Sequence, residues 1–183
     1  MAYNAEAIIE QSSQFDFYDG GGLDASFLGL AQADAEGNVN VSKFNGRPVG
    51  CGGFVNITRA TRKLVFCGSF TASGLELQVG DGRLVIGQEG RARKFVRKVE
   101  QITFNGRDAA FRGQEVVFIT ERAVFHLRPD GLELTEVAPG IDIERGVLAH
   151  MEFRPLCHNV RVMSEGLFRE RWGGLASAIR AFA

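Results

Sequence analysis

From residue 63 onward, apolar residues alternate with polar ones in short runs that are separated by Gly, Asp and Asn. A period of two is typical of β-strands with one buried face, and turn residues between the runs indicate hairpins. We therefore expect a strand-rich chain with hairpins at Asp81-Gly82 and at Pro129-Asp130-Gly131. The predicted strands span residues 63–70, 75–79, 83–87, 99–104, 116–120, 123–128 and 132–137.

The first third of the chain mixes helical and extended patterns. Asn4 is a predicted N-cap for a short helix over residues 5–11, where apolar residues share one face. A buried strand is predicted over residues 26–33. The turn residues 34–38 follow it and lead into the apolar run 39–41, which indicates a second hairpin.

Two helices are predicted in the last third of the chain. Asp142 can cap one from Ile143 to about Met151, and residues 153–162 after it are expected to be irregular. A longer amphipathic helix is predicted over 165–182, because apolar residues recur there at spacings of four, three, four and three, despite two glycines. These apolar residues are Phe168, Trp172, Leu175, Ile179 and Phe182. The helix must dock on this chain or on another. We find no repeat and no long linker, so residues 1–183 are expected to form a single domain.

The densest glycine cluster near a predicted helix start is Gly50-Cys51-Gly52-Gly53-Phe54. Glycine lets the chain turn through positive φ and bring its N–H groups close to another molecule. If a helix begins at Phe54, those N–H groups form a positive helix end that suits an oxyanion or a phosphate. A tight turn into a helix uses the same residues without any ligand, so the loop alone leaves both interpretations open.

Five stretches, in order, resemble the family I coenzyme A transferases, and within the family they are most similar to the single-chain propionate or acetate CoA-transferases. The resemblance runs from near the start to about Pro155. It implies an open α/β sandwich, with a strand-rich mixed sheet and flanking helices, and it implies that the chain is the C-terminal, β-subunit-like half of such an enzyme. The five stretches are Phe15-Asp16-Phe17-Tyr18-Asp19-Gly20-Gly21-Gly22-Leu23-Asp24, Leu28-Gly29-Leu30-Ala31-Gln32, Gly50 to Phe54, Ile119 to Phe125 and Gly131 to Asp142.

The resemblance also implies roles for individual residues. The backbone N–H at Gly53, with Gly52 beside it, would form half of the oxyanion hole that receives the thioester carbonyl oxygen, and the other half of the enzyme would supply the second donor. Gly50 would shape the loop, with Cys51 as a small side chain in it, and Phe54 would shape the acyl pocket or pack.

A second group of residues is implied to lie beside the catalytic cleft. Gly21 and Gly22 would allow close backbone approach, and Asp24 would accept hydrogen bonds from neighbouring N–H groups. Gln32, at the end of the next strand, would contact substrate or satisfy buried backbone. The implied substrates are an acyl-CoA and a carboxylate. No cofactor is expected, because coenzyme A takes part as a substrate.

The family's nucleophile is a glutamate that carries CoA as a glutamyl thioester, and it lies upstream of the stretch that matches Tyr3-Asn4-Ala5. Glu6 and Glu10 precede the first motif but lack the glycine-flanked context that the nucleophile requires. The chain is therefore expected to be inactive alone and to complete its site with the N-terminal half, within a homo-oligomer. The alternative is a non-catalytic remnant or an oligomerisation module that keeps the fold.

Composition narrows the partners further. A formal net charge of −1 over 183 residues provides no long-range field for nucleic acid or anionic lipid, so neither is an expected partner. The run Arg91 to Lys98 holds five cations, which could contact a phosphate or a partner subunit, or could form a solvated edge that discourages aggregation.

Cysteines, histidines and the N-terminus suggest no further chemistry. Three scattered cysteines, Cys51, Cys67 and Cys157, indicate free thiols in a reducing cytoplasm. The three histidines match no metal-binding spacing, so no metal is expected. No segment has the pattern of a signal peptide or a membrane span, and we expect a soluble cytoplasmic protein.

Overall fold

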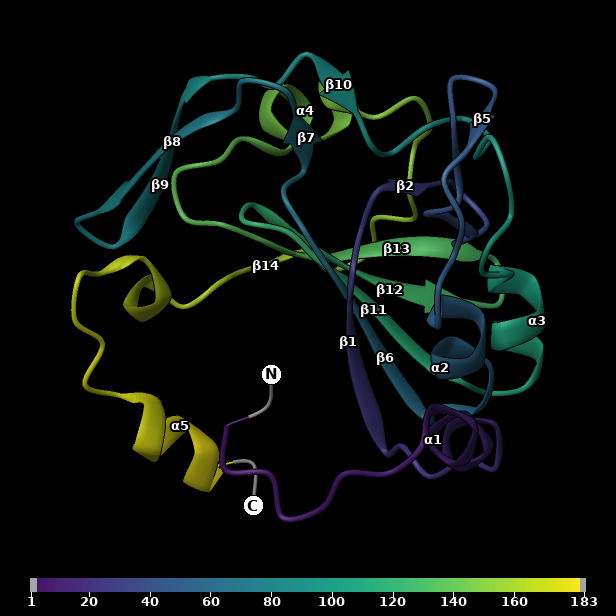
Figure 1. The fold of residues 1–183 in the computed structure, drawn as a ribbon. Helices are drawn as coiled ribbons and strands as arrows, with labels where there is room; N and C mark the ends of the chain where they lie inside the picture. The colour runs from purple at the N-terminus through teal and green to yellow at the C-terminus, as the bar shows by residue number, and fades with distance from the viewer. Residues whose placement is uncertain (1–2, 182–183) are drawn as a thin grey trace.

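A six-stranded mixed sheet forms the centre of the computed structural model, which describes residues 3–181 (Figure 1). Three strands run parallel, β1 to β6 to β11, and two antiparallel hairpin strands continue the sheet before the parallel strand β14 ends it. The expectation of a mixed sheet with flanking helices is confirmed. In sheet order the strands are β1 (Ala25–Gly29), β6 (Lys63–Cys67), β11 (Glu115–Ile119), β12 (Ala123–Arg128), β13 (Gly131–Val137) and β14 (Arg161–Val162).

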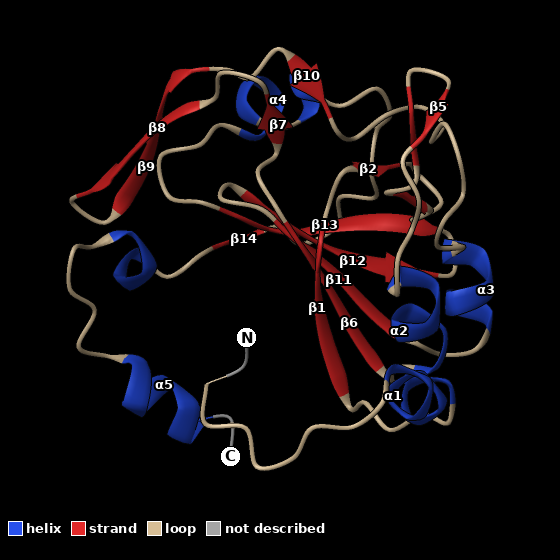
Figure 2. Cartoon of the chain, viewed as in Figure 1, coloured by secondary structure: helices blue, strands red, loops and turns tan. Residues whose placement is uncertain are grey.

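Helices α1, α2 and α3 lie together on one side of this sheet (Figure 2). Phe54 of α2 and Ala109 of α3 join the core that covers this face, because each turns its apolar side toward the strands. The helices are α1 (Gln11–Asp19), α2 (Phe54–Ala60), α3 (Gly106–Phe111), α4 (Ile143–Gly146) and α5 (Leu175–Ala181), with short 3-10 turns η1 (Leu148–His150) and η2 (Glu165–Phe168).

Four small two-stranded ribbons surround the sheet. The predicted hairpin at Asp81-Gly82 is confirmed: both residues have positive φ, 52° and 76°, as the favoured two-residue turn requires. The hairpins at residues 34–38 and 129–131 are confirmed as well. The ribbons pair β2 (Gln32–Ala33) with β3 (Val39–Asn40), β4 (Lys43–Phe44) with β5 (Arg47–Pro48), β7 (Thr71–Ala72) with β10 (Ala92–Arg93), and β8 (Glu76–Gly80) with β9 (Arg83–Gln88).

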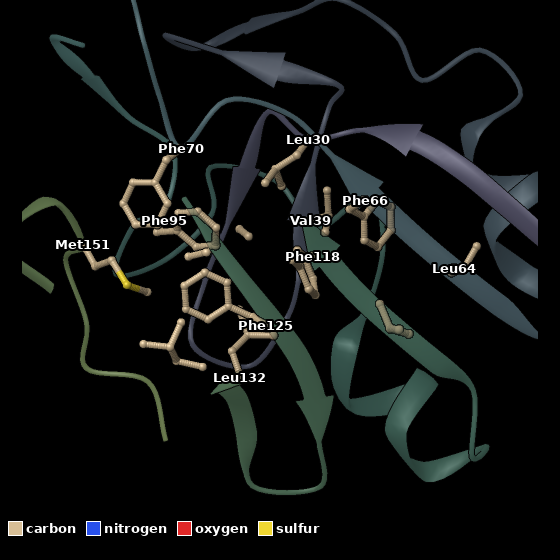
Figure 3. Close-up of a cluster of buried hydrophobic side chains, with 14 of the residues drawn as sticks. Leu30, Val39, Leu64, Phe66, Phe70, Phe95, Phe118, Phe125, Leu132 and Met151 are labelled. Carbon is tan, nitrogen blue, oxygen red and sulfur yellow. The ribbon is translucent and has the colours of Figure 1, made fainter. Parts of the chain in front are cut away.

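The core is rich in phenylalanine and draws on segments that are far apart in the sequence (Figure 3). The Phe95 ring lies 4.8 Å from that of Phe70 and 4.9 Å from that of Phe125, centroid to centroid. Phe66 on β6 similarly contacts Phe118 on β11, at 5.2 Å. Aromatic pairs at such distances add to the stabilisation from area burial. The core therefore ties the ribbons to the central sheet.

Three strand predictions differ from the structure, and the first of them, the strand over 63–70, ends at Cys67. The single strand over 26–33 is divided: β1 ends at Gly29, and β2 leaves the sheet to pair with β3. Residues 99–104 form no strand, and only Phe104 makes an isolated bridge, to Val39. The apolar residues of this irregular segment include Val99 and Phe104, whose side chains are buried. Their burial gives the apolar pattern of a strand although no β-ladder of backbone hydrogen bonds forms.

The predicted helix over residues 5–11 is wrong, because α1 begins at Gln11. Asn4 has a φ of 55° and is not its cap. Ile8 and Ile9 are exposed, Ile8 by 91%. A two-turn helix is unstable in water without a surface to bury its apolar face, and this segment has none among the described residues.

The two predicted C-terminal helices are shorter than expected. Asp142 caps α4 through the Arg145 N–H, but α4 stops at Gly146, whose carbonyl oxygen accepts a hydrogen bond from Arg122 instead. The helix over 165–182 is broken into η2 and α5, and the Trp172 ring packs against Gly166 and Gly174 between them. Phe182 lies outside the described residues.

The N-cap of α3 offers a test of local stability. The Asn105 side chain accepts a hydrogen bond from the Asp108 N–H at 3.0 Å. Asn105→Ala is expected to lower the free energy of unfolding by about 1 kcal/mol in urea titration, because one N–H of the first turn loses its acceptor. Asn105→Ser, which restores an acceptor, is the control. An alanine variant as stable as the serine variant would contradict this role.

No helix among residues 3–181 is long and apolar enough to cross a lipid bilayer.

Candidate functional site

The glycine loop has the conformation that its sequence indicates. The β4–β5 ribbon delivers the chain into it, and the Val49 N–H donates to the Ser42 carbonyl at 2.8 Å, which anchors its entry. Gly50 and Gly52 have φ values of 86° and 52°. Helix α2 begins at Phe54 as predicted. The loop is thus a positive-φ turn that ends at the N-terminus of a helix.

Four consecutive backbone N–H groups of this loop, those of residues 50–53, donate to no acceptor among the described residues. The Phe54 N–H is already used, since it donates to the Cys51 carbonyl at 3.0 Å, and the Gly53 carbonyl accepts from the Ile57 N–H. Within residues 3–181, the N–H groups of Gly52 and Gly53 have no hydrogen-bond acceptor. Adjacent free N–H groups at a glycine turn can bind a developing negative charge on oxygen.

Aromatic side chains support the loop from two sides. A methyl group at Gly53 would lie 3.0 Å from Cζ of Phe15, so α1 closes directly over this glycine. Phe54 is buried and stacks on Phe66, with ring centroids 5.8 Å apart. Of the two roles considered for Phe54, packing is therefore the one that its contacts show. Cys51 is exposed at the surface of the loop.

Gly21, Gly22 and Asp24 lie at the other end of α2. The nearest atom to a methyl group placed on Gly21 would be the Ala60 carbonyl oxygen, at the last residue of α2. Since seven helical residues span about 10 Å, these residues are not brought beside Gly53. Asp24 is exposed and forms an ion pair with Arg62, in place of the expected hydrogen bonds from N–H groups to its side chain.

Gln32 supports the glycine loop indirectly. Its side-chain oxygen accepts from Asn40 Nδ2 at 2.7 Å and from the Glu100 N–H at 3.4 Å. The same Asn40 nitrogen donates to the Lys43 carbonyl at 2.6 Å, at the start of the ribbon that leads into the loop. Asn40 is fully buried, and sequence reasoning missed it. A polar residue on an otherwise apolar strand, at Val39-Asn40-Val41, was the available signal.

The basic run Arg91 to Lys98 does not act as one surface. Lys94 is half-buried, and its Nζ donates to the Leu30 carbonyl at 2.9 Å, where β1 ends. Burial lowers the pKa of Lys94, and the charge of Glu121 opposes that effect. The Arg93 guanidinium donates to the Ala149 carbonyl at 3.2 Å. At least two of the five cations therefore bind carbonyl groups of this chain.

A buried ion-pair network at Arg122 is the second feature that sequence reasoning missed. The guanidinium is inaccessible to solvent and pairs with Glu89 at 2.7 Å and Glu121 at 2.6 Å. It lies 4.9 Å from the centre of the Phe70 ring. Burial alone would raise the pKa of Glu89, but hydrogen bonds from Arg122 and Thr71 outweigh it and lower that pKa. The network joins three segments, because Arg122 binds Glu89, Glu121 and the Gly146 carbonyl.

Among residues 3–181, no three or more His, Cys, Asp or Glu side chains gather as a metal site would require. The three cysteines are free and exposed.

No protein-family profile matches the chain. It is 49% identical, over 180 residues, to the caffeate CoA-transferase of Acetobacterium woodii. This alignment covers 95% of this chain and 34% of that protein. It is also 49% identical, over 166 residues, to the acetate CoA-transferase YdiF of Escherichia coli K12. That alignment covers 90% of this chain and 31% of that protein. The chain thus spans about a third of the length of these relatives.

Solved structures agree with this similarity. The acyl-CoA transferase YdiF of E. coli O157:H7, in a thioester complex with CoA, superposes with a TM-score of 0.91 at 47% identity, over 94% of this chain and 34% of that one. Glutaconate coenzyme A-transferase from Acidaminococcus fermentans superposes with a TM-score of 0.63 at 17% identity, over 88% of this chain and 62% of that one, which shows a shared fold.

Proposed function

We propose that this chain, which belongs to the family I coenzyme A transferases, is the C-terminal portion of a short-chain acyl-CoA:carboxylate CoA-transferase. Its substrates would be an acyl-CoA and a free carboxylate. The N-terminal portion would supply the glutamate that carries CoA as a thioester. The observation that carries the proposal is the Gly53 N–H, which belongs to the run of free N–H groups over residues 50–53 in the positive-φ glycine loop.

The geometry suits the addition step of acyl transfer. When a carboxylate oxygen attacks the thioester carbonyl carbon, the carbonyl π electrons move onto oxygen and form a tetrahedral oxyanion. Donors already aimed at that oxygen stabilise it without reorganisation, and losing one such donor slows comparable enzymes by about 10²–10³. The oxyanion then re-forms the carbonyl and expels the CoA thiolate, which attacks the resulting glutamyl anhydride to give the glutamyl thioester and the free carboxylate. Gly53 would contribute one donor throughout.

The proposal places the nucleophile outside this chain, and that placement can be tested directly. The purified chain would be incubated with acetyl-CoA and propionate, treated with hydroxylamine or borohydride, and analysed by mass spectrometry. We expect no modified glutamate in the chain alone. Mixed with the part of the A. woodii caffeate CoA-transferase that it does not match, we expect modification of one glutamate of that part, together with acyl exchange.

Two outcomes would contradict the proposal. An adduct on Glu6, Glu10 or another acid of this chain would mean that the nucleophile is present. A stable mixed complex that neither exchanges acyl groups nor forms an adduct would favour the alternative, a module that keeps the fold and its contacts without transferring CoA. Omitting propionate is the control, since the glutamyl adduct should then accumulate without product.

A further inference from the structure

The middle of the glycine loop makes few contacts of its own. A methyl group placed on Gly50 or Gly52 would meet no atom of residues 3–181 within 4 Å, apart from its chain neighbours. A segment with so few contacts has little local stability, so the points at which it is held decide its conformation. Phe54, which is buried in the core, holds the end of the loop. Val49 holds its beginning, through the hydrogen bond from its N–H to the Ser42 carbonyl.

Ser42 is itself fixed by the side chain of Asn40, which is fully buried. Asn40 Oδ1 accepts from the Ser42 N–H at 3.0 Å and from the Lys43 N–H at 3.1 Å. Asn40 Nδ2 donates to the Lys43 carbonyl at 2.6 Å and to Gln32 Oε1 at 2.7 Å. An amide side chain has two donor hydrogens and an oxygen with two lone pairs, so Asn40 is fully satisfied. All but one of its hydrogen bonds fix the backbone of Ser42 and Lys43.

Thr103 fixes the same stretch from a distant segment. Its Oγ1 accepts from the Val41 N–H at 3.2 Å and lies 2.7 Å from Oγ of Ser42. Lys43 begins β4, which pairs with β5, and β5 ends one residue before Val49 (Figure 1). The strand pairing and the hydrogen bond between Val49 and Ser42 therefore carry the position of this anchor to the residue that enters the glycine loop.

We propose that Asn40 is a positioning residue for the transfer reaction: it fixes the entry of the glycine loop and thereby aims the Gly53 N–H at the developing oxyanion. The inference rests on the proposed function. Because Asn40 is inaccessible to solvent, it acts through Ser42 and Val49 and makes no contact with substrate. Small displacements matter at such a site, since a misplacement of about 1 Å caused by a distant mutation can slow an enzyme about 10²-fold.

Asn38, two residues earlier, provides a matched control. It is also buried, and its side chain also both accepts and donates. Its Oδ1 accepts from the Gly106 N–H at 3.0 Å, and its Nδ2 donates to Asp34 and Glu36. These partners lie in the turn between β2 and β3 and at the start of α3, away from the ribbon that leads into the glycine loop. Alanine at either position removes a buried, hydrogen-bonded amide, so both variants should lose similar stability.

Amide hydrogen exchange in the chain alone, followed by NMR, tests the anchoring without requiring activity. In Asn40→Ala we expect the Val49 amide to exchange at least tenfold faster and the amide resonances of residues 50–53 to shift. In Asn38→Ala we expect faster exchange at the Gly106 amide, with Val49 and residues 50–53 unchanged. Circular dichroism would verify that both variants fold.

Thr103→Val keeps the test decisive if Asn40→Ala does not fold. Valine has nearly the shape of threonine but removes the hydroxyl that binds Ser42 and the Val41 N–H. Asn40 keeps its own hydrogen bonds in this variant, so we expect the same changes at Val49 and in residues 50–53 to be smaller.

Kinetics test what the anchoring does for the reaction. The chain would be mixed with the unmatched part of the A. woodii caffeate CoA-transferase and assayed for acyl exchange. Asn40→Ala is expected to lower kcat at least tenfold while the KM for acetyl-CoA changes less than twofold, because a misdirected oxyanion donor raises the barrier without weakening substrate binding. Asn38→Ala should keep both constants.

Two results would overturn the inference. One is an equal kcat for the two variants, whether both values fall or neither does, since a general loss of structure would affect them alike. The other is a Val49 amide whose exchange Asn40→Ala leaves unchanged. If the unsubstituted chain shows no acyl exchange in the mixture, the proposed function fails, and the amide data alone then decide whether Asn40 holds the loop.

Discussion

Replacing Arg122 with alanine is expected to lower the free energy of unfolding by about 3–5 kcal/mol. The guanidinium is fully buried and pairs with Glu89 and Glu121, whose side chains are only 23% and 16% exposed. Removing the cation would leave two largely buried carboxylates facing each other and would take a donor from the Gly146 carbonyl. The effect should be large because Arg122 joins the β11–β12 turn to α4 and to the segment after β9.

Urea-induced unfolding, followed by circular dichroism, would measure this loss. Arg154→Ala is the matched control, since Arg154 forms an ion pair of 3.0 Å with Glu144 in which both side chains are more than 60% exposed. An exposed pair of this kind contributes about 1 kcal/mol or less. If the two variants were destabilised equally, the buried network would not have the role assigned to it.

The same network predicts how stability depends on pH. The pKa of Glu89 in the folded protein lies below its ordinary value of 4.5. The unfolded chain therefore binds the proton more readily, so the contribution of Glu89 is complete above pH 4.5 and is lost as the pH falls through the folded pKa. In Arg122→Ala the lowering of the Glu89 pKa should vanish. The stability difference between the two proteins should then shrink on acidification, which urea titrations from pH 7 to pH 3 would show.

Gly52→Ala is expected to slow acyl transfer by about 10²-fold in the mixture with the unmatched part of a relative. Gly52 has a φ of 52°, a conformation in which a Cβ atom costs about 1–2 kcal/mol. The loop would relieve that strain by rotating the peptide between Gly52 and Gly53, which carries the Gly53 N–H. A donor that turns away from the developing oxyanion raises the barrier without weakening substrate binding, so kcat should fall more than KM changes.

Gly113→Ala separates this effect from simple backbone strain. Gly113 follows α3 with a φ of 70°, and a methyl group at either glycine would meet no atom within 4 Å. Both variants should lose similar stability, whereas only Gly52→Ala should lose activity. Equal rates for the two variants would exclude the glycine loop as an oxyanion-binding element.

Local sequence patterns predicted the elements whose cause is local. The turn at Asp81-Gly82 follows from residues that accept positive φ, and the start of α2 follows from the glycines before Phe54. Strand β6 and the hairpin β12–β13 follow from alternation over a few residues. The family resemblance added the order of these elements and the role proposed for Gly53, which periodicity alone does not contain.

Elsewhere, distant residues decided the outcome. The Gly146 carbonyl at the end of α4 binds Arg122, which is 24 residues away. Gln32 is held by Asn40 and Glu100, and Arg122 is paired with Glu89 across 33 residues. The two residues of each pair lie too far apart in the sequence to fall within one helical or strand pattern, so the local periodicity of apolar residues cannot predict these contacts.

By itself, then, the sequence determined the strand-rich mixed architecture, the positions of its turns and a positive-φ glycine loop before α2, because each depends on neighbouring backbone conformations. Only the tertiary structure decided which N–H groups of that loop stay free, which carboxylates surround Arg122, and which groups bind the buried side chain of Asn40. These features depend on which surfaces meet when distant segments pack, since a hydrogen bond or a buried charge is defined by its partner in space.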